Sequence, residues 1–169
     1  MRTIQVTAAR TFAIQAHGNQ RYGDAPYHVH LDAVVELLEP YGPVAQTIGY
    51  LHDVVEDTKV TKDDIEAMFD GFVADAVDIL TDEPGANRAE RKARTYKKMS
   101  EVEGDLCLAL LVKTADRLAN VKACVEMGRN DKLAMYKDEH KSFRTAVYRP
   151  GLCEELWEEL NSLLAGSDL

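Results

Sequence analysis

Cysteine, excess positive charge and long apolar runs are all scarce in this sequence. The three cysteines, Cys107, Cys124 and Cys153, are odd in number and lack C-x-x-C spacing, so we expect neither a disulfide framework nor a zinc-thiolate site. A net charge of −9 and a pI near 5.0 disfavour sequence-independent binding to nucleic acid or anionic membranes. No segment approaches the roughly 18 consecutive apolar residues of a membrane span. We therefore expect a cytoplasmic protein with reduced thiols.

The composition is that of an ordinary globular protein, with 46% hydrophobic and 29% charged residues. Apolar residues recur at helical spacing along most of the chain, and turn formers such as Pro40, Gly42 and Pro150 interrupt the pattern. We predict an all-α, single-domain fold over residues 1–169, with about eight to ten helices. A chain of this length buries a core of its own, so a metal would serve function and not folding.

Three local expectations follow from the pattern. Residues 19–27 are rich in polar residues and turn formers and should form a loop. Residues 43–57 should form one helix, with His52 and Asp53 in its last turns. Ser100 to Glu103 is a candidate start for the longest helix, which is apolar nearly all round.

The stretch from His52 to Asp57 holds one imidazole and three carboxylates. On a helix, Glu56 and Asp57 follow Asp53 by three and four positions, so these groups share one edge. Carboxylates this close repel one another unless a cation neutralises them or solvent screens them. A divalent metal is the simplest remedy. The alternative, a solvated acidic helix end, leaves the adjacent His-Asp pair poorly explained.

Asp116 lies in the apolar segment that should cross the core. A buried acid carries a large desolvation cost unless it is paired or bound to a metal. Pairing with Lys113 or Arg117 is the alternative to metal binding. Asn120, four residues further on, shares its helical face and is placed to hydrogen-bond to what Asp116 holds.

Two histidines and two aspartates from three predicted helices would form a mixed nitrogen and oxygen ligand set. This set suits manganese, with zinc, iron or magnesium as alternatives. Its members are His30, His52, Asp53 and Asp116. Glu56 and Asp57 would then remain as acid/base groups for a water that attacks phosphorus.

Positive charge concentrates in residues 87–98 of this acidic protein. The segment is either a solvated helix face, partly balanced by Glu90, or an electropositive wall that attracts an anionic substrate. Arg21, in the predicted loop, is either plain surface charge or a phosphate contact. The leucine stripe of the last helix indicates core packing, with self-association into a homo-oligomer as the alternative.

Four blocks of the sequence carry a family resemblance. They are H-G-N-Q-R at 17–21, P-Y-H-V-H at 26–30, L-H-D-V-V-E-D-T at 51–58 and V-K-T-A-D-R-L-A-N at 112–120. In order and approximate spacing they resemble the HD-domain family, and more closely the small alarmone hydrolases and the hydrolase domain of RelA/SpoT proteins. The resemblance covers about residues 5–125 and implies an HD-type helical fold, on which the helices of residues 129–165 would pack.

The resemblance also implies a role for each site residue. His30, His52, Asp53 and Asp116 match manganese ligands, Glu56 and Asp57 match the pair that activates water, and Arg21 and Asn120 match substrate contacts. The implied activity is that of a stand-alone guanosine-3′,5′-bis(diphosphate) 3′-pyrophosphohydrolase, which releases pyrophosphate from (p)ppGpp by attack of a metal-activated water.

Two positions depart from the family pattern. Tyr22 stands where lysine is frequent, and Leu31 stands where proline is usual. Leu31 should change only local backbone geometry. Tyr22 removes a cation and could stack on a base, so an adenosine alarmone, NADPH or another nucleoside phosphate is the alternative substrate. From a different class, the alternative is a nucleotide-binding sensor with weak turnover.

Overall fold

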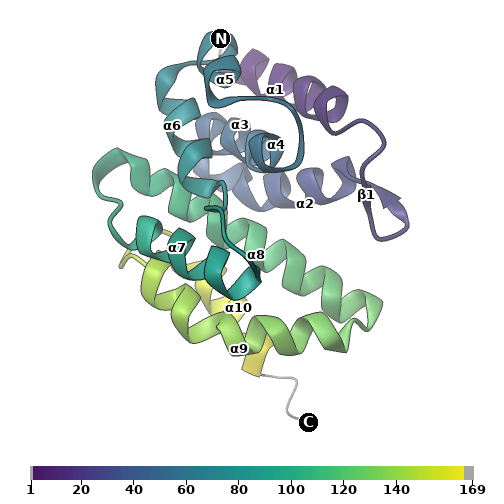
Figure 1. The fold of residues 1–169 in the computed structure, drawn as a ribbon, viewed down its shortest axis with the longest axis vertical. Helices are drawn as coiled ribbons and strands as arrows, with labels where there is room; N and C mark the ends of the chain where they lie inside the picture. The colour runs from purple at the N-terminus through teal and green to yellow at the C-terminus, as the bar shows by residue number, and fades with distance from the viewer. Residues whose placement is uncertain (1, 166–169) are drawn as a thin grey trace.

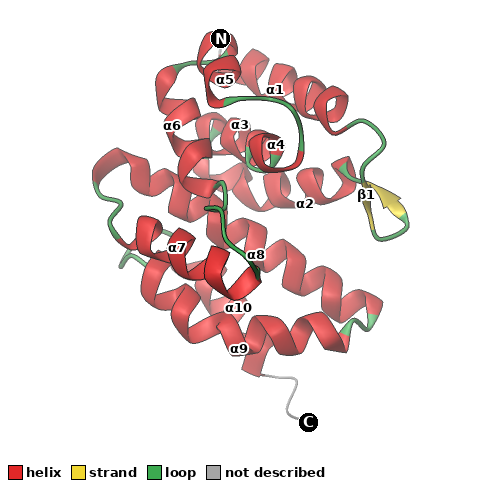
Figure 2. Cartoon of the chain, viewed as in Figure 1, coloured by secondary structure: helices red, strands yellow, loops and turns green. Residues whose placement is uncertain are grey.

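The computed structural model describes residues 2–165, almost all of them in helices (Figures 1 and 2). The elements are α1 (Arg2–His17), β1 (Arg21–Tyr22), β2 (Ala25–Pro26), α2 (His28–Leu38), η1 (Glu39–Tyr41), α3 (Pro43–Leu51), α4 (Val54–Asp57), α5 (Lys62–Met68), α6 (Gly71–Leu80), α7 (Arg88–Ser100), η2 (Gly104–Leu106), α8 (Cys107–Met127), α9 (Asn130–Val147) and α10 (Glu154–Ala165). The predicted all-α fold is therefore confirmed. The extent of the domain over residues 1–169 stays a prediction, and its ends lie outside the described residues.

Local sequence signals fix several of these helix ends. Thr61 accepts a hydrogen bond from the backbone N–H of Asp64 and returns one to its carboxylate, which forms a capping box at the start of α5. Asn87 accepts from the backbone N–H of Glu90 at the start of α7. Gly128 ends α8 in the left-handed region at φ 66°, a conformation that glycine adopts without steric cost.

Helix α8 is the centre of the packing. In Figure 1 it crosses the molecule between α2 and α3 on one side and α9 and α10 on the other. Its buried residues lie on every face of the helix between Ala109 and Val121. Because the core surrounds α8, a polar side chain between Ala109 and Val121 must contact another buried group or line a functional site. No helix among residues 2–165 has the length and hydropathy needed to cross a membrane.

The predicted continuous helix over residues 43–57 is wrong. Helix α3 ends at Leu51, and α4 begins at Val54. Asp53 sits at φ −105°, ψ −1°, in the bridge region between helix and strand. The break affects the candidate site because His52 and Asp53 lie between two helices, so their side-chain directions are not set by the spacing of one helix.

Two other expectations change in detail. The longest helix starts at Cys107, because Ser100 still belongs to α7 and a 3₁₀ turn precedes α8. The predicted loop of residues 19–27 contains a short antiparallel hairpin in which Arg21 pairs with Pro26. Its turn includes Gly23 at φ 58°. This hairpin projects beside the start of α2 (Figure 1), and the ring of Tyr22 stacks on that of His30.

Candidate metal centre

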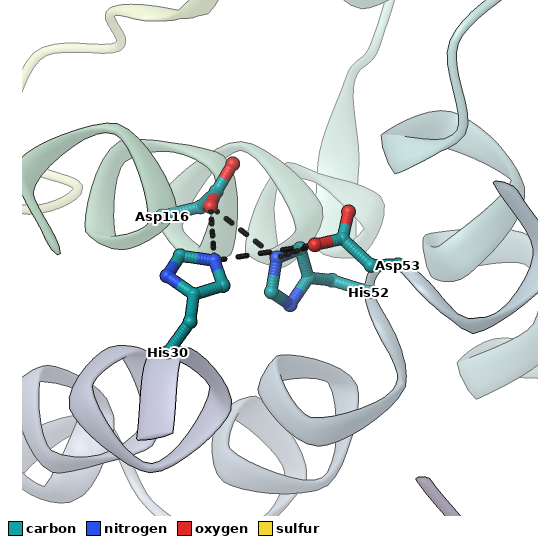
Figure 3. A group of neighbouring side chains, drawn as sticks. All are labelled: His30, His52, Asp53 and Asp116. Atoms are coloured by element: carbon teal, nitrogen blue, oxygen red, sulfur yellow. Dashed lines mark hydrogen bonds and ion pairs between the residues drawn. The ribbon is translucent and has the colours of Figure 1, made fainter. Parts of the chain in front are cut away.

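Four side chains from three segments converge in one cluster (Figure 3). His30 comes from α2, His52 and Asp53 from the break after α3, and Asp116 from α8. Each offers one ligand atom, and these atoms lie within 4.8 Å of one another. Nε2 of His30 is 3.0 Å from Oδ1 of Asp116, and Nε2 of His52 is 3.0 Å from Oδ2 of Asp53.

The hydrogen bonding of His52 indicates which kind of ligand this cluster fits. Its Nδ1 lies 2.6 Å from the carbonyl oxygen of Gly49, which can only accept, so Nδ1 carries the proton. In the neutral ring, Nε2 then presents a lone pair. This nitrogen is buried and makes no hydrogen bond within the described part of the chain. The carboxylate oxygens of Asp53 and Asp116 lie 3.0 and 3.3 Å from this nitrogen. A cation bound among the three atoms would remove the repulsion between the lone pair and the two negative charges.

Without a metal, the electrostatics instead favour a proton on this ring, which also places positive charge beside the two carboxylates. Burial opposes a charged imidazole, yet the charges of Asp53 and Asp116 raise the pKa of His52 well above its usual value. Burial likewise opposes ionisation of Asp116, but Lys113 and His52 hold the pKa of this carboxyl well below its usual range. Two buried carboxylates thus demand positive charge at one point, and a His/Asp group of this kind fits a divalent metal.

The two oxygens of Asp116 have different partners. Oδ1 faces His30 and accepts from the amide of Asn120 at 3.0 Å. Oδ2 accepts from Nζ of Lys113 at 3.3 Å, so the ion pair considered in the sequence is present. Arg117 instead contacts Glu139 at 3.3 Å. One oxygen of Asp116 is therefore directed to the cluster, and the other is held by a buried lysine.

Two tyrosines contact the cluster: Tyr27, which motif reasoning did not single out, and Tyr22, which it considered only as a residue that stacks on a base. The hydroxyl of Tyr27 donates to Oδ2 of Asp53. Tyr22 stacks on the His30 ring at a centroid distance of 4.7 Å, and its hydroxyl donates to Oδ1 of Asn120 at 2.7 Å. Tyr27 lies inside the P-Y-H-V-H block, which is the signal that could have identified it. Nothing in the sequence alone indicates that Tyr22 turns toward His30.

Glu56 and Asp57 follow on α4, with side chains exposed at the surface. Oε1 of Glu56 accepts from the backbone N–H of Asp82 at 2.7 Å. Oδ2 of Asp57 accepts from Gln20 at 3.0 Å, and Gln20 in turn contacts His17. Although both side chains reach the surface, the surrounding protein displaces part of the solvent around their carboxyl groups, which raises the pKa of both acids, and the charge of Asp53 adds to this effect. A raised pKa makes a carboxylate a stronger base toward water than a fully solvated one.

A cavity of about 140 Å³ lies beside Asn120, between the hairpin, α8 and α9. Three exposed cations line it, namely Arg21, Arg129 and Lys132. Arg21 also donates to the carbonyl of Asp24 within the hairpin. A second cavity, of about 370 Å³ and more apolar, includes His30 and lies between α2 and α8. Tyr22, Ala123 and Met127 line both cavities.

Two kinds of sequence comparison were informative: one against protein families and one against individual proteins. No protein-family model matches the chain. It is 30% identical over 159 residues to a probable guanosine-3′,5′-bis(diphosphate) 3′-pyrophosphohydrolase of Synechocystis, covering 90% of this chain and 21% of that protein. It is 33% identical over 118 residues to the Danio rerio guanosine-3′,5′-bis(diphosphate) 3′-pyrophosphohydrolase MESH1, covering 66% of this chain and 64% of that protein.

A solved structure described as a metazoan ortholog of SpoT that hydrolyzes ppGpp superimposes with a TM-score of 0.78. The match covers 98% of this chain and 96% of that one, at 23% identity. The fold and the paired histidines and aspartates define an HD-type all-α domain. In sequence the chain is similar to HD-type alarmone hydrolases.

Proposed function

We propose that this protein is a metal-dependent guanosine-3′,5′-bis(diphosphate) 3′-pyrophosphohydrolase. The observation that carries the proposal is the convergence of His30, His52, Asp53 and Asp116 within 4.8 Å, from segments far apart in the sequence. The names of the Synechocystis and Danio rerio relatives support the substrate class. Because the chain spans only part of each relative, the activity is inferred from the site together with this likeness.

We assign His30, His52, Asp53 and Asp116 as the metal ligands, and Mn²⁺ as the preferred ion. Mixed imidazole and carboxylate ligands suit Mn²⁺, which is softer than Mg²⁺ and accepts nitrogen donors. A bound divalent ion supplies Lewis acidity and lowers the pKa of a coordinated water. The Nδ1 contact of His52 with Gly49 fixes the ring orientation for this role.

Glu56 and Asp57 act on the water. A carboxylate with a raised pKa accepts a proton from water and returns one to the leaving oxygen. Water adds to the ribose-proximal phosphorus of the 3′-diphosphate, the bond from that phosphorus to the 3′-oxygen breaks, and the 3′-oxygen takes up a proton. Pyrophosphate and GDP, or GTP from the pentaphosphate, are the products.

Arg21 and Asn120 lie on the substrate side. The cavity they share also holds Arg129 and Lys132, so its lining is cationic and fits phosphate groups remote from the reacting bond. The amide of Asn120 is already engaged by Tyr22 and Asp116. Asn120 therefore orients a ligand carboxylate as well as facing the cavity.

A substrate panel tests this function. Purified protein, stripped of metal and then given Mn²⁺, Mg²⁺ or Zn²⁺, is assayed with ppGpp, pppGpp, pppApp, NADPH and ordinary nucleotides. We expect release of pyrophosphate from ppGpp and pppGpp, fastest with Mn²⁺. Turnover confined to pppApp or NADPH would move the substrate assignment to the nucleotides that Tyr22 suggests. Tight nucleotide binding without turnover would indicate a sensor.

A further inference from the structure

Four basic side chains of residues 87–98 have partners within the molecule, namely Arg88, Lys92, Arg94 and Lys98. Helix α7 directs several of its polar side chains onto the segment that follows α6. Arg94 donates to the carbonyl of Pro84 at 2.7 Å, and Lys98 donates to the carbonyl of Thr81 at 2.8 Å. The hydroxyl of Thr95 accepts from the backbone N–H of Glu83 at 2.9 Å. The segment of residues 81–84 is thus held along its length by α7.

Among these α7 residues, Lys92 contacts Asp82, the residue whose backbone binds Glu56. Its Nζ lies 2.9 and 2.8 Å from the two carboxylate oxygens of Asp82. Both side chains are only 13% exposed, so the pair is largely shielded from solvent. Burial opposes ionisation of Asp82, but Lys92 holds the pKa of its carboxyl below its usual value. Because a buried charge is costly to leave unpaired, this ion pair fixes the position of Asp82.

Asp82 then contacts Glu56 through its backbone. Its N–H donates to Oε1 of Glu56 at 2.7 Å. One carboxylate oxygen of Glu56 is occupied in this way, which leaves Oε2 as the oxygen available to a water. An exposed glutamate on a short helix otherwise has several rotamers open to it.

We propose that Lys92 is a positioning residue for Glu56, acting through Asp82. The chain of contacts runs from Nζ of Lys92 to the Asp82 carboxylate, and from the Asp82 N–H to Oε1 of Glu56. This inference rests on the proposed role of Glu56 in activating water. It gives the basic segment a function that needs no direct contact with substrate.

Kinetics of single variants test the positioning role. Lys92→Met should lower kcat by about 10-fold to 100-fold, as a misplaced catalytic group does, and leave KM and Mn²⁺ affinity within about twofold. Asp82→Asn, which retains the backbone N–H, should lower kcat similarly. The double variant should be no worse than the poorer single one, since both break one ion pair. Lys92→Arg should restore much of the loss. Lys97→Met, an exposed lysine of the same helix, is the matched control and should leave kcat unchanged.

Amide exchange at Asp82, followed by NMR, tests the same contacts without any turnover. We expect faster exchange in Lys92→Met and in Glu56→Ala, and unchanged exchange in Lys97→Met. Unchanged exchange in Lys92→Met would overturn the proposal, as would parallel losses of kcat, Mn²⁺ affinity and melting temperature. If the wild-type protein shows no turnover, the proposed function fails, while the exchange result still decides whether Lys92 holds Asp82 against Glu56.

Discussion

The metal centre and the cationic cavity beside it are built in opposite ways. His30, His52 and Asp116 are 3%, 1% and 7% exposed, and each is fixed by at least one further side-chain or backbone contact. Arg21 and Lys132, by contrast, are exposed and reach the cavity from a hairpin and from the start of α9. The residues proposed for the chemistry are buried and held by several contacts, whereas those proposed to bind the substrate are exposed side chains that can change at little structural cost.

The largest loss of metal and turnover should come from a substitution in the buried metal centre. Asp53→Ala removes an oxygen ligand and leaves His52 without its nearest carboxylate. We expect bound metal to fall to background by elemental analysis. Turnover should fall by more than about 10³-fold, because loss of a ligand exceeds the roughly 10-fold to 100-fold cost of an outer-shell change. Full retention of metal in the folded variant would contradict the ligand assignment.

Glu56→Gln comes next. It keeps the shape of the side chain and removes its basicity, so kcat should fall by about 10²-fold to 10⁴-fold while metal content and KM stay near wild type. Glu158→Gln, an exposed glutamate on α10, is the matched control and should have no effect. Steady-state kinetics with metal analysis make the comparison. An unchanged kcat would remove Glu56 from the mechanism.

Tyr27→Phe deletes only the hydroxyl that donates to Asp53. We expect Mn²⁺ affinity to weaken by about 10-fold to 100-fold, the usual effect of removing a partner of a metal ligand. Titration of metal-free protein measures it. Tyr148→Phe deletes a hydroxyl that contacts Glu154, away from the cluster, and should leave the affinity unchanged. Equal affinities for both variants would show that Tyr27 does not support the site.

The smallest effect should come from the exposed cavity. Lys132→Ala should raise KM for ppGpp by about twofold to fivefold with kcat unchanged, because an exposed charge contributes little and is screened by salt. The difference should shrink at high ionic strength. Lys141→Ala, also exposed on α9, is the control. A loss of kcat in Lys132→Ala would mean that the cavity takes part in the chemistry.

The convergence of His30, His52, Asp53 and Asp116 could be predicted because their pattern in the sequence is unusual. An adjacent His-Asp pair and an acid within an apolar segment both need an explanation, and one cation explains both. The sequence also indicates most helices, through apolar spacing and the capping-box pattern that begins at Thr61. The break after Leu51 escaped prediction because Val54 and Val55 continue the apolar pattern of α3 across it, so periodicity carries no sign of the turn.

The supporting contacts could not be predicted for a different reason. Tyr22 and Asn120 are 98 positions apart, and their hydrogen bond depends on how the hairpin folds onto α8. The pairing of Lys92 with Asp82 likewise depends on how α7 packs against the preceding segment. Composition shows a basic stretch but not its partners. The ligand and catalytic roles themselves stay predictions.

Hydrolysis of ppGpp in ¹⁸O-water with Mn²⁺, followed by mass spectrometry of the products, tests the central claim most directly. Attack of water on the ribose-proximal phosphorus of the 3′-diphosphate predicts one ¹⁸O atom in pyrophosphate and none in GDP. Label in the nucleoside product, release of orthophosphate as the first product, or turnover that survives removal of divalent metal would contradict the account.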